Sequence, residues 1–501
     1  MKIKRFFTVI LVLFIAGCET IEFEDSVNPY LNKRGTYVLL GSNNGNNFQF
    51  TNRERYNEYE ENPFIQVSEN PISTFSIDAD GASYSNIRRF LNDGKLPPKD
   101  AVRTEELINY FIFDYPEPTD GYAISINGEV SICPWEQSNK LIRIGIKGKT
   151  IPKESLPPSN IVLLIDVSGS MSSQNKLDLL KESFVLFVNE LDFRDKLAIV
   201  TYAGVAGVAL TSTNGSEKET IINVINNLEA GGSTAGAQGI ITAYEIAQEN
   251  FVEGGNNRVI LATDGDFNVG PSSQEELVEL IESKRDYGIF LTVLGVGTGN
   301  LNDAAMEQIA NNGNGNYEYI DNIEQAEKVL VHEFNKFFTV AKDVKFQITF
   351  NPYLVEAYRL IGYENRLLDQ EDFEDDEKDA GEIGSGQAIT ALYEIIPVNN
   401  TNYTGITTIE IDLRFKNPDE DVSKIIQLDI VDQNNSFDLA SESLRFAASV
   451  TGFAMLLRDS PYKGNTDYDK ILNWTESSIS FNPHNYKDGF IELVNLAKNM
   501  E

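Results

Sequence analysis

The chain has 501 residues, of which 41% are hydrophobic and 23% are charged, a balance typical of a globular protein long enough for more than one domain. Its formal net charge of −35 excludes binding to nucleic acid or to anionic lipid through overall charge, because phosphate groups would be repelled. The acidity suits contact with divalent cations, although it can also serve solubility alone.

The N-terminus carries a targeting signal. Three basic residues come first, Lys2, Lys4 and Arg5. The apolar run 6–15 follows and is too short for a membrane span. It ends in Ile-Ala-Gly-Cys18, which resembles the bacterial lipobox and implies cleavage before Cys18 and a lipid on that residue. We therefore expect a signal peptide over 1–17 and a lipid anchor in the bacterial cell envelope, in the outer rather than the inner membrane. Whether the protein faces the periplasm or the cell surface stays open.

The two cysteines predict no intrachain disulfide. If Cys18 carries lipid, Cys133 has no partner, and its alternating apolar surroundings indicate a small buried or edge-strand residue. The polar, Asn- and Glu-rich stretch 18–67 is typical of a flexible tether.

Residues 68–150 read as an N-terminal segment of mixed helix and strand. A strand is predicted at Ser73–Ile77 and helices at 84–91 and 105–113. Alternating apolar residues over 124–146 predict half-buried strands that form a hairpin or part of a sandwich.

The stretch 158–325 has a different pattern, in which short apolar runs alternate with helical periodicity. The apolar runs are Ile161–Ile165, Leu197–Val200, Val259–Ala262 and Ile289–Val296. Buried strands alternating with amphipathic helices predict an α/β fold with a doubly wound, mainly parallel sheet. Period-two patterns return in 326–501, which we expect to be a β-rich and helical domain. Because the strands before and after the α/β unit have the same period-two alternation of apolar residues, we expect that unit to be inserted in, or flanked by, one β-rich domain.

Each of two acidic stretches can be interpreted either as an ordinary loop or turn or as a calcium site. The run 369–382 holds nine acids and one lysine, which is typical of a solvated loop; a calcium loop is the alternative, but the DxDxDG spacing is missing. Asp78-x-Asp80-Gly81 fits a turn at a strand end and, alternatively, a calcium ligand pair.

Gly295-x-Gly297-x-Gly299 lacks the GxGxxG spacing of a nucleotide-binding loop.

The candidate site lies where the predicted parallel strands end, because ligands of open α/β sheets bind beyond the carboxyl ends of the strands. The residues concerned are Asp166, Ser168, Ser170, Thr234 and Asp264. The three hydroxyls would be neutral ligands, and the two aspartates would supply charge largely through water. This set suits Mg²⁺, with Mn²⁺ or Ca²⁺ as alternatives, and leaves a position for a carboxylate from a partner. Each motif alone would read as a helix cap or a turn.

These motifs resemble a known family. Ile161–Met171 reads IVLLIDVSGSM, and with Gly231-Gly-Ser-Thr234 and Ala262-Thr-Asp264-Gly it is similar to the von Willebrand factor type A domain, whose metal-ion-dependent adhesion site uses DxSxS, a Thr and an Asp. The resemblance implies a Rossmann-like sheet that binds proteins through the metal. The segments SIDADGASYSNIRRFLNDGKLPP, AVRTEELINYF and DFEDDEKDAGEIGSGQAITALYE resemble the YfbK-like bacterial lipoproteins.

We therefore expect a lipid-anchored envelope protein whose type A domain binds a partner protein that presents Asp or Glu to the metal. The first alternative is an envelope scaffold whose metal is purely structural. The second is a metal-dependent hydrolase, but no general base accompanies the metal motifs, and the chain has no GxSxG, HExxH or P-loop. We therefore expect no enzymatic activity and no nucleic-acid partner.

Overall fold

The computed structural model describes residues 54–500 apart from 79, 120, 204, 233–235, 266–273 and 399–404. The predicted signal peptide, Cys18 and most of the predicted tether lie outside these residues. Residues Thr51–Glu501 form one compact unit. Among the helices that the structure describes, none combines the length and hydropathy needed to span a membrane.

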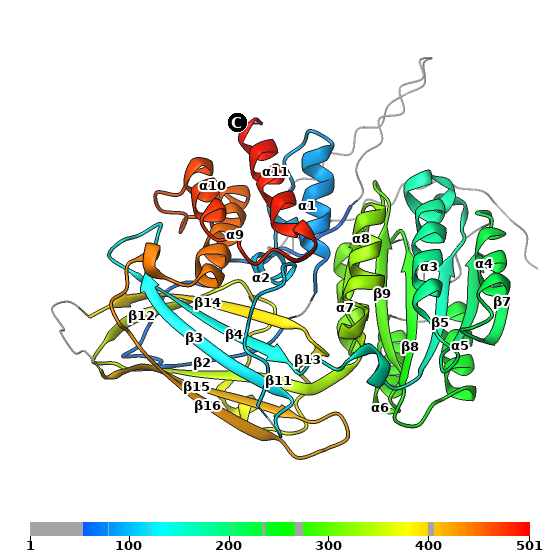
Figure 1. The fold of residues 1–501 in the computed structure, drawn as a ribbon, viewed down its shortest axis with the longest axis horizontal. Helices are drawn as coiled ribbons and strands as arrows, with labels where there is room; N and C mark the ends of the chain where they lie inside the picture. Colours follow the sequence, from blue (N-terminus) through cyan, green and yellow to red (C-terminus); the bar gives the residue numbers. More distant parts are fainter. Residues whose placement is uncertain are drawn as a thin grey trace, which may run out of the picture. The chain divides into compact units, whose positions relative to one another are not determined.

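The α/β part is built on a six-stranded sheet (Figure 1). Its strand order is β10 (Tyr317–Ile320), β9 (Phe290–Val296), β8 (Asn256–Thr263), β5 (Ser159–Asp166), β6 (Lys196–Ala203) and β7 (Val205–Asn214). All neighbours are parallel except β6 and β7. Every residue of β5 is buried, as its unbroken apolar run predicts for a central parallel strand.

Helices cover both faces of this sheet. One apolar core includes side chains of α3 (Leu179–Glu190), α4 (Lys218–Asn226) and α8 (Ile323–Glu327). The opposite core includes those of α5 (Gly236–Glu249), α6 (Gln274–Asp286) and α7 (Asp303–Asn312). The predicted doubly wound α/β fold is therefore confirmed, and the carboxyl ends of β5 and β8 meet at one edge of the sheet.

The β-rich part is a sandwich of two sheets. The first sheet has the order β1 (Ile65–Gln66), β12 (Val355–Ile361), β14 (Ala388–Pro397), β4 (Lys140–Gly148) and β3 (Ile124–Ile132). The second has the order β13 (Gly381–Gly384), β11 (Thr339–Phe350), β15 (Thr407–Lys416) and β16 (Lys424–Val431), and β2 (Ile72–Ser76) also pairs with β11. One apolar core joins the inner faces of both sheets.

Strands from both ends of the chain build this sandwich. β4, which precedes the α/β part, pairs with β14, which follows it. β2 likewise pairs with β11, where Phe75 lies opposite Phe346 with their ring centroids 5.0 Å apart. The expectation that the α/β unit is inserted in one β-rich domain is therefore confirmed.

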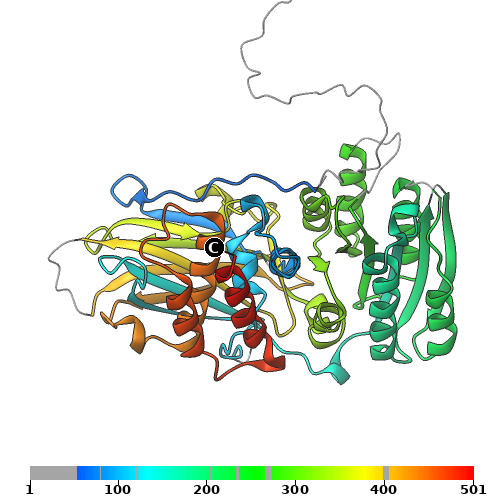
Figure 2. The ribbon, with the colours of Figure 1, turned by 90° about the horizontal axis from the view of Figure 1, so that it is seen from above.

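A layer of helices lies over the first sheet of the sandwich (Figures 1 and 2). It consists of α1 (Ala82–Asn92), α2 (Thr104–Asn109), α9 (Glu442–Arg458), α10 (Tyr468–Glu476) and α11 (Tyr486–Lys498). These helices share one apolar core, which also includes Leu141 of β4 and Leu392 of β14. The helix predicted over 105–113 ends earlier, at Asn109.

Three segments differ from, or refine, their predictions. Residues 54–67, the end of the predicted tether, contact the folded unit: Arg55 bridges Asn302, and β1 pairs with β12. The acidic run is not simply a solvated loop, because its last two residues begin β13, and Asp376 pairs with Arg414 at 2.9 Å. Cys133 is a buried free thiol, as predicted, and burial raises its pKa well above the usual value.

Candidate metal centre

The site begins at the exit of two neighbouring parallel strands. Asp166 ends β5, and Asp264 follows the last residue of β8, Thr263. The Thr263 hydroxyl donates to Asp166 Oδ2 at 3.2 Å, which joins the two strand ends. The backbone N–H of Ser168 donates to Asp166 Oδ1 at 2.8 Å, so the acid also fixes the loop that follows it.

Two serine hydroxyls lie in the loop that follows Asp166. Ser168 Oγ and Ser170 Oγ lie 3.0 Å apart. Two neighbouring ligands of an octahedral Mg²⁺, each at about 2.1 Å, would be separated by about 3.0 Å, so this pair fits one edge of such a coordination sphere. Ser168 is buried and Ser170 is exposed, which leaves the hydroxyl edge open to solvent.

A glycine loop lies against the serine loop. Gly231 N donates to Val167 O at 2.7 Å, and Gly169 N donates to Gly232 O at 3.2 Å. Gly232 has φ +86°, and a Cβ there would lie 3.0 Å from Ala203 O, so this approach favours glycine. The loop leads toward Thr234, which lies outside the described residues. The role of Thr234 as a ligand therefore stays a prediction.

The two acids have different electrostatic environments. Burial raises the pKa of Asp166, hydrogen bonds from Ser168 oppose this shift, and the charge of Asp264 adds to it. Burial also acts to raise the pKa of Asp264, but the hydrogen bond and charge of Lys176 outweigh it, so that pKa lies below its usual value.

Lys176 is a functional candidate that the sequence patterns did not reveal. Its ammonium donates to Asp264 Oδ2 at 2.8 Å and to Asn300 Oδ1 at 2.9 Å. The side chain of Lys176 is 7% exposed and that of Asp264 is 0% exposed, so the pair is buried. A lysine six positions after the serine ligand Ser170 belongs to no recognised motif; the signal in the sequence is a basic residue close to a cluster of ligands in an acidic chain.

The glycine run after β9 has its explanation here. Gly297 has φ +74°, and a Cβ on it would lie 2.3 Å from Lys176 Cε. The lysine stem therefore runs directly over this glycine on its way to Asp264. Of the three glycines, Gly297 serves close packing against Lys176, and the sequence lacks the spacing of a nucleotide-binding loop.

The oxygen donors of this centre fit a hard divalent cation. It offers two hydroxyls from Ser168 and Ser170 and two carboxylates from Asp166 and Asp264, all oxygen ligands that such ions prefer. Because Lys176 offsets the charge of Asp264, the centre carries little net negative charge. A cation bound there would supply a positive charge that could accept an anionic ligand.

Comparison with known proteins gives three family-model matches. The model for the von Willebrand factor type A domain matches residues 160–332, one described as von Willebrand factor matches 50–143, and one described as "Uncharacterized protein YfbK, C-terminal" matches 335–500. The chain is 41% identical over 468 residues to "Uncharacterized protein YfbK" of Escherichia coli (strain K12), a match that covers 88% of this chain and 81% of that protein.

Solved structures are similar at lower identity. A von Willebrand factor type A protein from Catenulispora acidiphila is 15% identical, with a TM-score of 0.42, over 74% of this chain and 89% of that one. The conserved hypothetical protein BatB from Bacteroides thetaiotaomicron is 24% identical, with a TM-score of 0.31, over 36% of this chain and 98% of that one.

Proposed function

Because the chain belongs to the YfbK family of von Willebrand factor type A domain proteins, we propose that its α/β domain binds a partner protein through a divalent cation. The proposed ligands are Asp166, Ser168, Ser170, Thr234 and Asp264. Mg²⁺ is the proposed ion, with Mn²⁺ or Ca²⁺ as substitutes. The proposed partner presents an Asp or Glu carboxylate to it.

The observation that carries this proposal is that two serine hydroxyls, one of them on a solvent-exposed residue, lie beside two carboxylates, one of which is offset by a buried lysine. The hydroxyls of Ser168 and Ser170 are 3.0 Å apart, and the second of these serines faces solvent. Lys176 offsets one of the two carboxylate charges behind them. A divalent cation in such a set keeps most of its positive charge and attracts an anionic side chain.

The position in the cell forms part of the same proposal. A lipid on Cys18 would hold the protein in the bacterial envelope, in the outer membrane. The acidic surface would then repel anionic lipid headgroups and keep the folded unit away from the bilayer. Replacement of Cys18 by Ala should abolish incorporation of radiolabelled palmitate and release the protein from the membrane fraction; retention of the label would contradict the proposed anchor.

The test of the function is partner capture from bacterial envelope extract. Wild type, Asp166→Ala and the matched control Asp286→Ala are compared in Mg²⁺ and in chelator. Asp286 is an exposed carboxylate on α6 of the same domain. We expect wild type and the control to retain the same proteins in Mg²⁺, chelator to release them, and Asp166→Ala to retain none of them. Equal retention by all three proteins in both conditions would contradict the proposal.

A further inference from the structure

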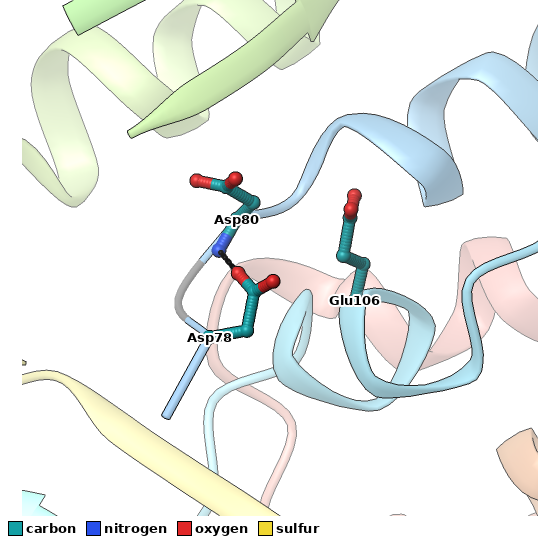
Figure 3. A group of neighbouring side chains, drawn as sticks. All are labelled: Asp78, Asp80 and Glu106. Atoms are coloured by element: carbon teal, nitrogen blue, oxygen red, sulfur yellow. Dashed lines mark hydrogen bonds between the residues drawn. The ribbon is translucent and has the colours of Figure 1, made fainter. Parts of the chain in front are cut away.

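A second group of carboxylates lies where the N-terminal segment meets the α/β domain (Figure 3). Asp78 and Asp80 follow β2, and Glu106 belongs to α2. One oxygen from each of the three carboxylates lies within 4.8 Å of the others. The three residues are 2%, 2% and 0% exposed.

The contacts of this group cross from one part of the unit to the other. Tyr317 of β10 donates its backbone N–H to Asp80 Oδ1 at 2.8 Å. Arg103 pairs with Glu106 and also with Asp303 of α7, the latter at 2.5 Å. The carboxylate group therefore sits at a junction that holds β10 and α7 of the α/β domain against the segment containing α2.

The buried charges at this junction do not balance. The acids are Asp78, Asp80, Glu106, Asp303 and Glu307, each at most 2% exposed. Among the described residues, the cations that pair with them are Arg103 and Arg366. Five carboxylates against two guanidinium groups leave an excess of negative charge, which is costly to bury unless protons or a cation compensate it.

The two carboxylate oxygens of Asp80 have different surroundings. Within the part of the chain that the structure describes, no group donates a hydrogen bond to Asp80 Oδ2. Burial, followed by the charges of Asp78 and Glu106, raises the pKa of Asp80 well above its usual value. A buried carboxylate oxygen without a donor is uncommon in a native fold, and a proton, a water or a cation would satisfy it.

A cavity lies beside two of the three carboxylates. Asp78 and Asp80 line a cavity of about 240 Å³, which also touches Asn311 and Asn314 from the end of α7. Glu106 is not among its lining residues, so the cavity gives a route of entry to Asp78 and Asp80 rather than the coordination space itself.

We propose that Asp78, Asp80 and Glu106 bind a calcium ion that fastens the N-terminal segment to the α/β domain. Ca²⁺ accepts six to eight oxygens at about 2.3–2.6 Å in irregular arrangements, so oxygens nearly 5 Å apart can share one ion. Mg²⁺ demands a near-octahedral set at about 2.0–2.1 Å and keeps more of its water, which suits this irregular, carboxylate-rich group less well. The site is separate from the Ser168 centre and does not rest on the function proposed for it.

The test measures calcium in a protein whose other centre is disabled. Purified Asp166→Ala protein is stripped with chelator, dialysed against Ca²⁺ and analysed for bound calcium by plasma emission, and its melting temperature is recorded with and without Ca²⁺. We expect one tightly bound calcium per chain and a higher melting temperature in Ca²⁺. The absence of both effects would overturn the proposal and indicate that protons balance the charge.

Two further substitutions in the same background locate the ion. Asp80→Asn preserves the side-chain shape and should remove the bound calcium and the thermal shift. Asp379→Asn changes the other described acidic group, Asp343, Asp379 and Glu382, and should leave both unchanged. Calcium retained by the Asp80→Asn variant, or lost with Asp379→Asn, would overturn the assignment. If Asp80→Asn fails to fold, Glu106→Gln provides the same comparison, and calcium retained by that variant would overturn the assignment too.

Discussion

Replacing Lys176 with methionine probes the electrostatics of the Ser168 centre. Methionine keeps the length and apolar stem of the side chain but removes the charge that lies 2.8 Å from Asp264 Oδ2. Loss of one partner from a buried ion pair costs about 3–5 kcal/mol, because the remaining charge is left uncompensated. We therefore expect Lys176→Met to lower the free energy of unfolding by about that amount in chelator.

The same substitution should behave differently when cation is present. A divalent cation can replace the missing positive charge, so Mg²⁺ should recover most of the lost stability. Mg²⁺ should bind the variant at least about tenfold more tightly, a gain of about 1.4 kcal/mol, because the competing ammonium is gone. Binding of the partner protein should weaken, because the added negative charge makes the bound cation less attractive to a carboxylate.

The assay combines urea unfolding followed by circular dichroism with calorimetric titration of Mg²⁺. The control is Lys181→Met, because the ammonium of Lys181 on α3 donates to Leu228 O at 2.9 Å and its loss should cost less than about 1 kcal/mol. An equal loss of stability with and without Mg²⁺, together with unchanged Mg²⁺ affinity, would refute the reasoning.

Gly297→Ala perturbs the same lysine from the opposite side. A left-handed φ of +74° costs an L-residue about 1–2 kcal/mol, and the new Cβ would lie 2.3 Å from Lys176 Cε. Gly299→Ala carries the same backbone strain at φ +92°, but among the described residues no atom lies within 4 Å of its Cβ position. Only Gly297→Ala should raise Mg²⁺ affinity in the calorimetric titration; equal effects of both substitutions would contradict the assigned contact.

Two further predictions concern the free energy of unfolding, measured in urea. Arg88→Ala removes a guanidinium that contacts both oxygens of Asp321, at 2.5 and 2.8 Å, and should lower that free energy by about 3–5 kcal/mol. The control Lys95→Ala breaks an exposed pair with Asp93, 3.9 Å apart, and should lower it by less than about 1 kcal/mol. Burial lowers the pKa of Lys487 to about 8, so the folded state releases this proton before the unfolded state does, and stability gains about 1–2 kcal/mol as pH rises from 8 to above 10. Lys487→Met should lose this gain, measured as the difference between the two proteins at each pH; identical pH profiles would contradict the assignment.

Much of the α/β domain could be predicted because its central strands are buried on both faces. The runs at Ile161–Ile165 and Val259–Ala262 stand out from polar surroundings, and the acids that follow them mark the strand ends. The edge strand β7, by contrast, opens with small non-polar residues around Gly207 and ends in four polar residues, so it lacks the bulky branched run of the central strands. Its antiparallel pairing with β6 depends on tertiary contacts that residue periodicity does not encode.

The sandwich shows a different limit of sequence patterns. Period-two alternation over Val344–Phe350 indicates which face of β11 is buried, but it does not identify the neighbouring strand. One of its three neighbours is β2, more than 260 residues earlier in the chain. The role of Lys176 could not be predicted for a similar reason, because its ion pair with Asp264 and its contact with Gly297 form only when the chain folds.

The role of Glu106 beside Asp78 and Asp80 could not be foreseen either. The Asp-x-Asp-Gly turn alone is ambiguous between a simple turn and a cation site. Only the packing of α2 against this turn brings in a third carboxylate, and only the folded structure shows that no described residue donates to Asp80 Oδ2.

The central claim is that the two serine hydroxyls and the aspartates behind them hold a divalent cation. Crystals of the protein grown with Mn²⁺ test it directly through anomalous difference density. We predict a peak about 2.0–2.3 Å from both Ser168 Oγ and Ser170 Oγ in wild type, and its loss in Asp166→Ala. A wild-type map without a peak between these hydroxyls, at a Mn²⁺ concentration that saturates binding in solution, would contradict the account.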